Sequence, residues 1–328
     1  MTLILNSQDV KQAINLRTII DQIEKGLVEE YNGHTENPPR LNMRTGNDGF
    51  YRIMSAVMNE SGYQGFKVFF KGGPSVRYLI GIINQQTNDL EAMMDSAYIT
   101  AVRTGATTGL ATKYLAREDA KTIGLIGSGL EGRTNLEAVC AVRKIDSAKV
   151  FSPTPARREA FAIEMSEKLG IKIEAVDTPE KAVEGVDIIN VCTNTSTKGN
   201  NVAFQGKWVS PGVHVNSIGS TMPLMREIDT DTFAKADGIV IDTKHLEEES
   251  GDVIEAIKEG KYDASIVTVL PALVTGHKVR TSENQVTLFK SVGTAIQDIM
   301  AARAVYEEAK KLNIGTDVGE FLESKLFN

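Results

Sequence analysis

The sequence has 328 residues, is 41% hydrophobic and carries a formal net charge of −7. A chain of this length can bury a large core and is expected to form two domains. The acidic balance and the scattered Lys and Arg residues argue against a nucleic-acid partner. The two cysteines and four histidines argue against a disulfide scaffold or a bound metal. No run reaches the roughly 18 apolar residues of a membrane span, and no signal peptide is recognisable, so a cytoplasmic protein without a membrane partner is expected.

The N-terminal part, residues 1–118, is predicted to be an α+β domain. A short strand at 3–5 precedes one amphipathic helix over 7–31, with Ser7 near its N-cap. Three β-like runs follow, separated by Gly, Asn and Pro clusters, as in an antiparallel sheet. These runs are residues 50–57, 65–70 and 78–84. A helix rich in Ala, Thr and Leu is expected over 95–116.

Strands and helices alternate over residues 119–293, which predicts a Rossmann-type doubly wound sheet. The expected strands are 123–126, 149–151, 173–175, 188–192, 213–217 and 239–242. A last helix over 294–311 leaves this alternation. The segment 294–328 is therefore predicted to return to the first domain, which would serve substrate binding and dimerisation.

A G-x-G-x-x-G motif follows the first strand of this alternating region directly and opens a helix. Gly127 would make the tight turn, Gly129 would let backbone N–H groups approach a pyrophosphate, and Gly132 would let the helix pack close to the strand. An anion is favoured at such a helix N-terminus. The motif in this context predicts a dinucleotide cofactor.

The next strand ends near the position where NAD-binding folds usually carry Asp or Glu for the ribose hydroxyls. Here the chain offers hydroxyl groups at Ser152 and Thr154 and guanidinium groups at Arg157 and Arg158. A carboxylate would repel a 2′-phosphate, whereas these groups can bind one. The segment predicts NADP(H) as the preferred cofactor, with NAD(H) possible. The alternative is that both arginines are solvated charges on the next helix.

Four further stretches accompany the glycine motif in order: residues 103–116, 208–219, 249–252 and 289–298. Together with that motif, they resemble the ornithine cyclodeaminase/mu-crystallin family over nearly the whole chain. The resemblance implies a homodimer built through the first domain, a nicotinamide cofactor on the second, and chemistry at a C–N bond.

The resemblance also implies roles for three cations. Arg40 matches the family's arginine for the substrate carboxylate, Lys67 its active-site lysine, and Arg103 an arginine that contacts carboxylate and cofactor. Hydride transfer to a carbon bearing nitrogen and a carboxylate needs such cations, and an acid that keeps the imine protonated. A lysine on an apolar strand beside two arginines would have its ammonium form disfavoured, which suits proton donation. The alternative is a lysine whose stem lines the strand while its charge reaches solvent.

Thr221 departs from the cyclodeaminase pattern. Members that cyclise ornithine carry a catalytic Asp in a Gly-Asp-x-Pro pattern, whereas the matching segment here reads Gly-Ser-Thr-Met-Pro. A threonine hydroxyl is not a general base near neutral pH, although it can hydrogen-bond an imine or a water. Mu-crystallin-like ketimine reductases also carry a small hydroxyl residue here. Thr221 therefore points to imine reduction, with this residue at the reacting group.

The resemblance implies further cofactor contacts in the second domain. They are the backbone N–H groups of Leu130 and Glu131 at the pyrophosphate, Thr193 on the adenosine side, Asn216, Ser217 and Ile218 at the nicotinamide, and Ser291 at the carboxamide. Two nearby carboxylates, Glu227 and Asp298, are expected to be structural, and His214 is expected to be a packed core residue.

The leading prediction is an NAD(P)H-dependent reductase of an imine or ketimine of an α-keto acid, which in reverse is an amino-acid dehydrogenase. One alternative is an ammonia-releasing lyase of the ornithine cyclodeaminase type, against which Thr221 argues. The other is a non-catalytic NADPH-binding protein of the mu-crystallin type, against which Lys67 and Arg40 argue.

Overall fold

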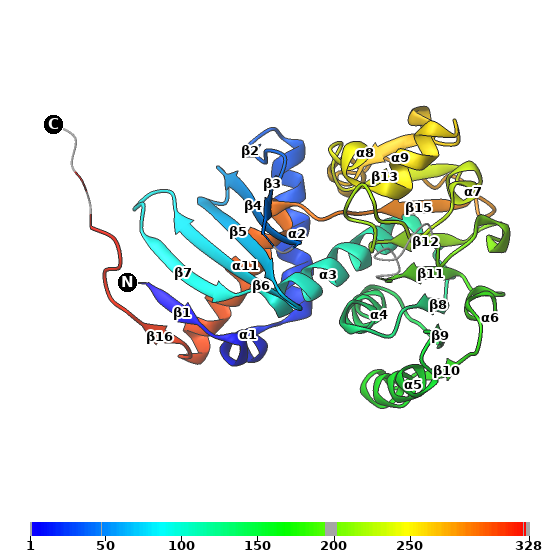
Figure 1. Cartoon of the computed structure of the whole chain (residues 1–328), viewed down its shortest axis with the longest axis horizontal. Coiled ribbons are helices and arrows are strands. Elements are labelled where there is room, and N and C mark those ends of the chain that lie inside the picture. The colour runs from blue at the N-terminus through cyan, green and yellow to red at the C-terminus, as the bar shows by residue number, and fades with distance from the viewer. Residues whose placement is uncertain (1, 47, 194–201, 324, 326–328) are drawn as a thin grey trace. The chain divides into compact units, whose positions relative to one another are not determined.

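The computed structural model describes residues 2–46, 48–193, 202–323 and 325. The chain forms two compact units (Figure 1): unit 1 comprises Met1–Arg103 and Thr294–Asn328, and unit 2 comprises Thr104–Gly293. The first part of unit 1 ends inside helix α3 (Ala97–Leu115), earlier than the boundary that the sequence predicts at 118/119.

Unit 1 is built on one mixed eight-stranded sheet, with the order β16-β1-β7-β6-β5-β4-β2 and β3 paired to β4. The strands are β1 (Leu3–Leu5), β2 (Thr35–Glu36), β3 (Leu41–Thr45), β4 (Gly49–Met58), β5 (Tyr63–Gly72), β6 (Ser75–Asn84), β7 (Leu90–Asp95) and β16 (Thr316–Asp317). The run β4-β5-β6-β7 is antiparallel. The three predicted β runs are confirmed as β4, β5 and β6, each with additional residues at one or both ends.

Unit 1 also contains the helices α1 (Ser7–Ala13), α2 (Leu16–Tyr31) and α11 (Ala295–Leu312), together with the first residues of α3. Helix α11 packs against β4, β5 and β6, and α2 packs against α11 (Figure 1). The helices approach closely because Gly26 has no side chain: a Cβ there would lie 2.7 Å from Met300 Cγ.

The prediction of one helix over 7–31 is wrong, because two asparagines start separate helices. Asn6, not Ser7, caps α1, and its side chain accepts hydrogen bonds from the backbone N–H groups of Gln8 and Asp9. Asn15 caps α2 by accepting from Thr18 N at 3.2 Å. Such local side-chain bonds compete with a continuous helix.

Unit 2 is a parallel eight-stranded sheet with the order β10-β9-β8-β11-β12-β15-β13-β14. The strands are β8 (Thr122–Ile126), β9 (Ser147–Phe151), β10 (Lys172–Ala175), β11 (Ile188–Val191), β12 (His214–Ser217), β13 (Gly238–Ile241), β14 (Val267–Val269) and β15 (Thr287–Lys290). The order reverses between β8 and β11, which defines the crevice where doubly wound folds bind ligands at the carboxyl ends of their strands. This architecture confirms the predicted fold class; β14 and β15 are additional to the predicted strands.

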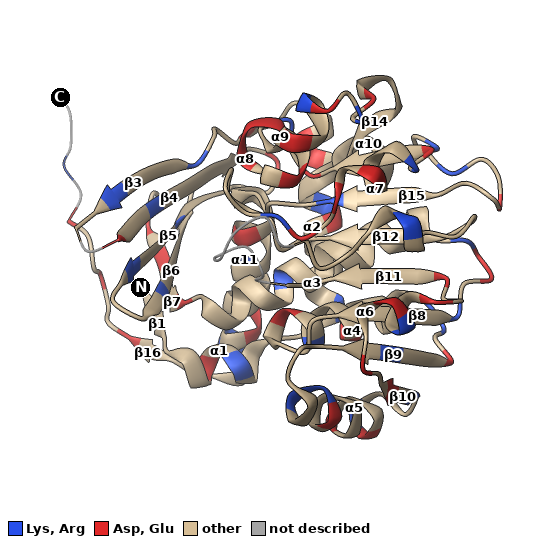
Figure 2. Ribbon diagram, turned by 45° about the vertical axis from the view of Figure 1, so that its right-hand side comes forward, with Lys and Arg blue, Asp and Glu red and all other residues tan. Residues whose placement is uncertain are grey.

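The α-helices of unit 2 connect these strands. They are α4 (Leu130–Val142), α5 (Pro155–Leu169), α6 (Pro179–Val183), α7 (Thr230–Ala234), α8 (Leu246–Glu249), α9 (Gly251–Lys258) and α10 (Leu270–Val274). One hydrophobic cluster joins β8 and β9 to α4 and α5 through Leu125, Val150, Leu136 and Phe161. Residues of both charge signs occur throughout each unit (Figure 2). Within the described part of the chain, none of the helices combines the length and apolar character that crossing a membrane requires.

Candidate active site

A buried ion-pair cluster lies in unit 1, where β5 packs against α11. Lys67 Nζ donates to both carboxylate oxygens of Asp298, at 2.9 and 3.0 Å. Arg103 Nε donates to Asp298 Oδ1 at 2.7 Å, and Arg103 Nη1 donates to Gln297 Oε1 at 3.2 Å. Lys67 and Arg103 are 2% and 6% exposed and Asp298 is fully buried. The carboxylate therefore holds two cations together.

The two-residue period of β5 directs Lys67 into this cluster. Gly65 faces α11, because a Cβ there would lie 3.4 Å from Ile299 Cγ1. Lys67 and Phe69 alternate onto the same face. Asp298 lies in the first turn of α11, which Thr294 caps by accepting from Gln297 N.

The cluster changes the acid strength of its members. Burial lowers the pKa of Lys67 to about 8; Asp298 opposes this shift, while the charges of Arg103 and Arg40 add to it. Burial alone would raise the pKa of Asp298, but Arg103 and Lys67 outweigh it and hold the pKa below its ordinary value. Lys67 can therefore exchange a proton near neutral pH while Asp298 stays ionised.

Arg40 is half-buried just before β3, and its charge reaches Lys67. A further cation, Arg52, is a residue that the sequence reasoning missed. It is 7% exposed, and its guanidinium lies 4.8 Å from the ring centre of Phe50 and 5.4 Å from that of Phe69. Arg52 pairs with Phe69 across β4 and β5, so it shares the face of Lys67. The signal available in the sequence was the two-residue period of a strand over residues 50–58, which directs successive side chains to opposite faces of the sheet.

The glycine loop of unit 2 has the shape of a phosphate cradle. Gly127 has a φ of +115°, and a Cβ there would lie 2.3 Å from Cys192 O. A Cβ at Gly132 would lie 2.4 Å from Gly127 O, whereas one at Gly129 would meet no heavy atom within 4 Å. Gly129 caps α4 without a side-chain hydrogen bond. The open space and the first N–H groups of α4, at Leu130 and Glu131, fit a pyrophosphate.

The end of β9 offers hydroxyl and guanidinium groups. Ser128 Oγ donates to the Oγ of buried Ser152 at 2.8 Å, and Arg158 Nη1 donates to Ser152 O at 3.0 Å. Thr154 is the exposed N-cap residue of α5, and Arg157 is exposed in the first turn of this helix. Arg158 therefore fixes the strand end, while the guanidinium of Arg157 faces solvent.

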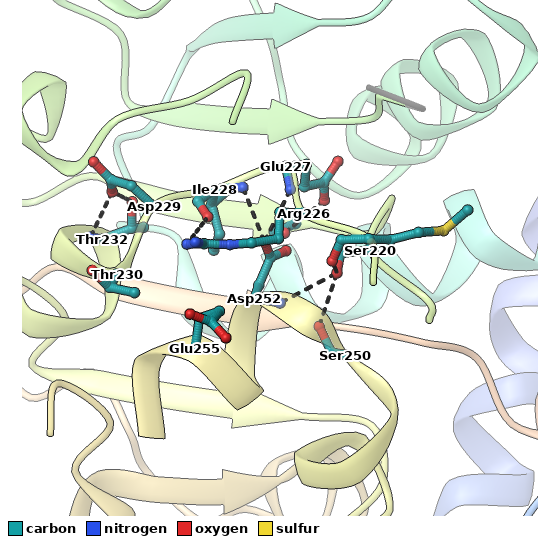
Figure 3. Close-up of polar contacts among 12 residues, drawn as sticks. Ser220, Arg226, Glu227, Ile228, Asp229, Thr230, Thr232, Ser250, Asp252 and Glu255 are labelled. Atoms are coloured by element: carbon teal, nitrogen blue, oxygen red, sulfur yellow. Dashed lines mark hydrogen bonds and ion pairs between the residues drawn. The ribbon is translucent and has the colours of Figure 1, made fainter. Parts of the chain in front are cut away.

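The loop that carries Thr221 is held at the start of α9 (Figure 3). Ser220 Oγ donates to Met225 O at 2.5 Å and lies 3.2 Å from Ser250 Oγ. Asp252 Oδ1 accepts from the backbone N–H groups of Glu227 and Ile228, at 2.9 and 3.3 Å. These bonds give the stretch 249–252 a role in fixing this loop. Thr221 itself is half-buried.

The hydroxyl groups of three predicted cofactor contacts bond to buried carboxylates. Ser217 Oγ donates to Glu227 Oε1 at 2.6 Å, and Thr193 Oγ1 donates to Glu227 Oε2 at 3.2 Å. Ser291 Oγ donates to Asp242 Oδ2 at 2.6 Å. The side chains of Ser217 and Ser291 thus point into unit 2.

Two further predicted positions on β12 and just after it are also buried. Asn216 Nδ2 donates to Asn190 Oδ1 at 2.8 Å and to Thr112 Oγ1 at 3.0 Å, while Ile218 is 6% exposed. His214 is fully buried, and burial lowers its pKa to about 3, as expected for a packed core residue. Among the described residues, no group of three or more His, Cys, Asp or Glu side chains is placed to hold a metal ion.

Comparisons with known proteins support a single family. The family model for the ornithine cyclodeaminase/mu-crystallin family matches residues 1–313. A Delta(1)-pyrroline-2-carboxylate reductase of Bacillus cereus is 32% identical over 324 residues, covering 95% of this chain and 98% of the relative.

Two solved structures are also similar. A Delta(1)-pyrroline-2-carboxylate reductase of Thermococcus litoralis, in complex with NADH and L-proline, is 37% identical with a TM-score of 0.90, covering 96% of this chain and 100% of that one. An archaeal alanine dehydrogenase dimer with bound NAD is 29% identical with a TM-score of 0.89, covering 98% and 99%. The chain therefore belongs to the ornithine cyclodeaminase/mu-crystallin family.

Proposed function

We propose that this protein is a nicotinamide-dependent reductase of a cyclic imino acid, converting Delta(1)-pyrroline-2-carboxylate to proline and catalysing the reverse oxidation. The observation that carries this proposal is the buried Lys67, whose pKa of about 8 suits proton transfer and which shares a carboxylate with Arg103. The relatives at 32% and 37% identity are Delta(1)-pyrroline-2-carboxylate reductases, which supports the same reaction at a C–N bond.

Reduction of an imine adds a hydride to carbon and a proton to nitrogen. The nicotinamide, when bound, supplies the hydride. The ammonium group of Lys67 donates a proton to the imine nitrogen and is then reprotonated from solvent. Arg40 and Arg103 bind the substrate carboxylate, since guanidinium groups pair with carboxylates in two-point contacts. Asp298 orients Lys67 and Arg103, and the hydroxyl of Thr221 hydrogen-bonds the reacting nitrogen or a water.

The purified protein is expected to oxidise NADH or NADPH in equal amount to the Delta(1)-pyrroline-2-carboxylate consumed. It should release no ammonia from ornithine in the presence of catalytic NAD(P), because Thr221 is not a general base near neutral pH. Absorbance at the nicotinamide band and an ammonia assay measure the two activities. Substantial conversion of ornithine to proline would overturn the reductase proposal and favour a lyase.

We also propose NADPH as the preferred cofactor, with NADH accepted. The observation that supports this is the absence of a carboxylate from 152–158, together with the solvent-facing guanidinium of Arg157 and the anchored Arg158. The solved relatives bind NADH or NAD, so the preference rests on these residues alone.

Replacing Arg157 with Ala is expected to weaken NADPH binding by about 1–3 kcal/mol, the energy of a lost charge-assisted hydrogen bond. NADH affinity should stay at the wild-type value, because NADH has no 2′-phosphate. Isothermal titration with both cofactors provides the internal control. An equal loss for both would remove Arg157 from cofactor selection.

We also propose that the protein forms a homodimer through unit 1. The sheet face opposite α11 carries a set of half-buried apolar side chains, Ile53, Phe66, Val68, Leu79 and Met93, on four neighbouring strands. A second copy would remove this face from water. The alanine dehydrogenase relative is a dimer, which supports the same assembly.

A further inference from the structure

The carboxylate of Glu227 joins the residues at the carboxyl ends of two adjacent strands of unit 2. Its Oε2 accepts from Thr193 N at 3.1 Å and from Thr193 Oγ1 at 3.2 Å, directly after β11. Its Oε1 accepts from Ser217 Oγ and from Gly219 N, both at 2.6 Å, at the end of β12. Glu227 is 1% exposed, so these bonds replace water around the charge.

Two features show that the chain near Gly219 and Thr193 is fitted closely to this carboxylate. A Cβ at Gly219 would lie 2.3 Å from Glu227 Oε2 and 2.1 Å from Thr193 O, so the absence of a side chain there permits the close approach. The backbone of Glu227 is fixed in turn by Asp252, which accepts from its N–H group (Figure 3).

A buried cation joins a third strand to the same group. Lys290, the last residue of β15, is fully buried, and its Nζ donates to Ser217 Oγ at 3.0 Å. The Nζ lies 3.3 Å from Asp252 Oδ2 and 3.7 Å from Glu227 Oε1. With Arg226 Nε at 3.8 Å from Asp252 Oδ1, two cations balance two carboxylates, which offsets the cost of burying them.

This network lies at the carboxyl ends of β11, β12 and β15, which is the edge of the sheet where a dinucleotide binds. In a doubly wound fold the two halves of a dinucleotide lie over the carboxyl ends of the strands on either side of the switch point. The glycine loop and the end of β9 place the adenosine half over β8 and β9. The nicotinamide half therefore belongs over β11 and β12, the two strands whose ends Glu227 joins.

We propose that Glu227 is a positioning residue that fixes Thr193, just after β11, and residues 217–219, at the end of β12, for the nicotinamide half of the cofactor. The proposal rests on the proposed function only in that the chain binds a nicotinamide dinucleotide. This carboxylate orients the hydroxyls of Thr193 and Ser217, and the backbone N–H of Ile218 donates to Val191 O at 3.3 Å, so the chain at the ends of both strands is held in one arrangement.

The test compares binding of NADH with binding of ADP, which contains only the adenosine half and the pyrophosphate. Glu227→Gln places an amide NH2 against N–H and O–H donors. Ser217→Ala removes the hydrogen bonds of Ser217 Oγ to Glu227 and Lys290 while keeping the charges of both. Each variant is expected to raise the Kd of NADH about tenfold, the effect of losing one buried hydrogen bond. The Kd of ADP should not change.

Asp187→Asn is the matched control, because Asp187 lies at the opposite end of β11. Its carboxylate accepts from Arg117 Nη2 at 2.6 Å and from Thr122 N at 3.0 Å, so its loss should lower the melting temperature without altering the ratio of the two Kd values. Equal weakening of NADH and ADP in Glu227→Gln and Ser217→Ala, or unchanged NADH binding in folded protein, would overturn the proposal. Because no imine is used, failure to turn over any imine would count against the proposed function alone.

Discussion

Replacing Lys67 with Met is expected to lower the turnover number for imine reduction by about 10²–10⁴-fold, the range that one general acid contributes. The stem of Met fills nearly the same volume, whereas the proton that the imine nitrogen requires is no longer supplied. NADH affinity should be unchanged, because Lys67 lies in unit 1 and the glycine loop lies in unit 2. Steady-state kinetics and isothermal titration measure the two quantities.

Two further variants distinguish the loss of the proton donor at residue 67 from the loss of its positive charge and from a general effect of removing a lysine. Lys67→Arg keeps a cation beside Asp298 but cannot lose its proton near neutral pH, so it should also be inactive. Lys71→Met makes the same change four residues further along β5, where the side chain is half-buried, and should retain activity. An active Lys67→Met enzyme would remove Lys67 from the mechanism.

The rates of imine reduction and of the reverse amino-acid oxidation should change with pH in opposite senses. Lys67 has a pKa lowered to about 8, so its ammonium form is present below pH 8 and lost above it. Imine reduction needs the ammonium form and should decline as the pH rises through this value. Amino-acid oxidation needs the neutral amine form of Lys67 as the proton acceptor and should increase over the same pH range.

The sequence predicted those features that local patterns encode. The alternation of strands and helices and the three glycines of residues 127–132 require only neighbouring residues, and the structure bears out the fold they imply. Strand β15 was not predicted, because it ends in Lys290, whose type usually marks a surface position. Its burial depends on Glu227 and Asp252, which lie in other segments.

The partners within the candidate site could not be predicted from local patterns. Asp298 is 231 residues from Lys67 in the chain, and only the return of α11 to unit 1 brings the two together. The sequence therefore suggested a structural role for Asp298, although its carboxylate directly contacts the predicted acid. The same reasoning also suggested a structural role for Glu227, but not its partners, because Thr193 and Ser217 lie 34 and 10 residues away in the chain.

In the wild-type enzyme, imine reduction should decline as the pH rises through the pKa of Lys67; the pH of this decline is the pH limit. Replacing Asp298 with Asn is expected to shift this pH limit to a lower pH. Asp298 opposes the effect of burial on Lys67, so its loss lowers the pKa of Lys67 below about 8 and leaves a smaller ammonium fraction at neutral pH. The variant also leaves Lys67 and Arg103 buried without their shared anion. The free energy of unfolding should therefore fall by about 3–5 kcal/mol, as when one partner of a buried ion pair is removed.

A pH–rate profile with Delta(1)-pyrroline-2-carboxylate distinguishes this role from simple loss of stability. The matched control is Glu29→Gln, because Glu29 is a buried carboxylate of unit 1 that bonds to Glu60 N at 2.7 Å and to Ser61 Oγ at 2.6 Å. Removing that charge should lower stability and leave the pH limit in place, since Glu29 contributes to none of the causes that shift Lys67. If Asp298→Asn keeps the wild-type pH limit, the group that titrates in catalysis is not Lys67 in contact with Asp298.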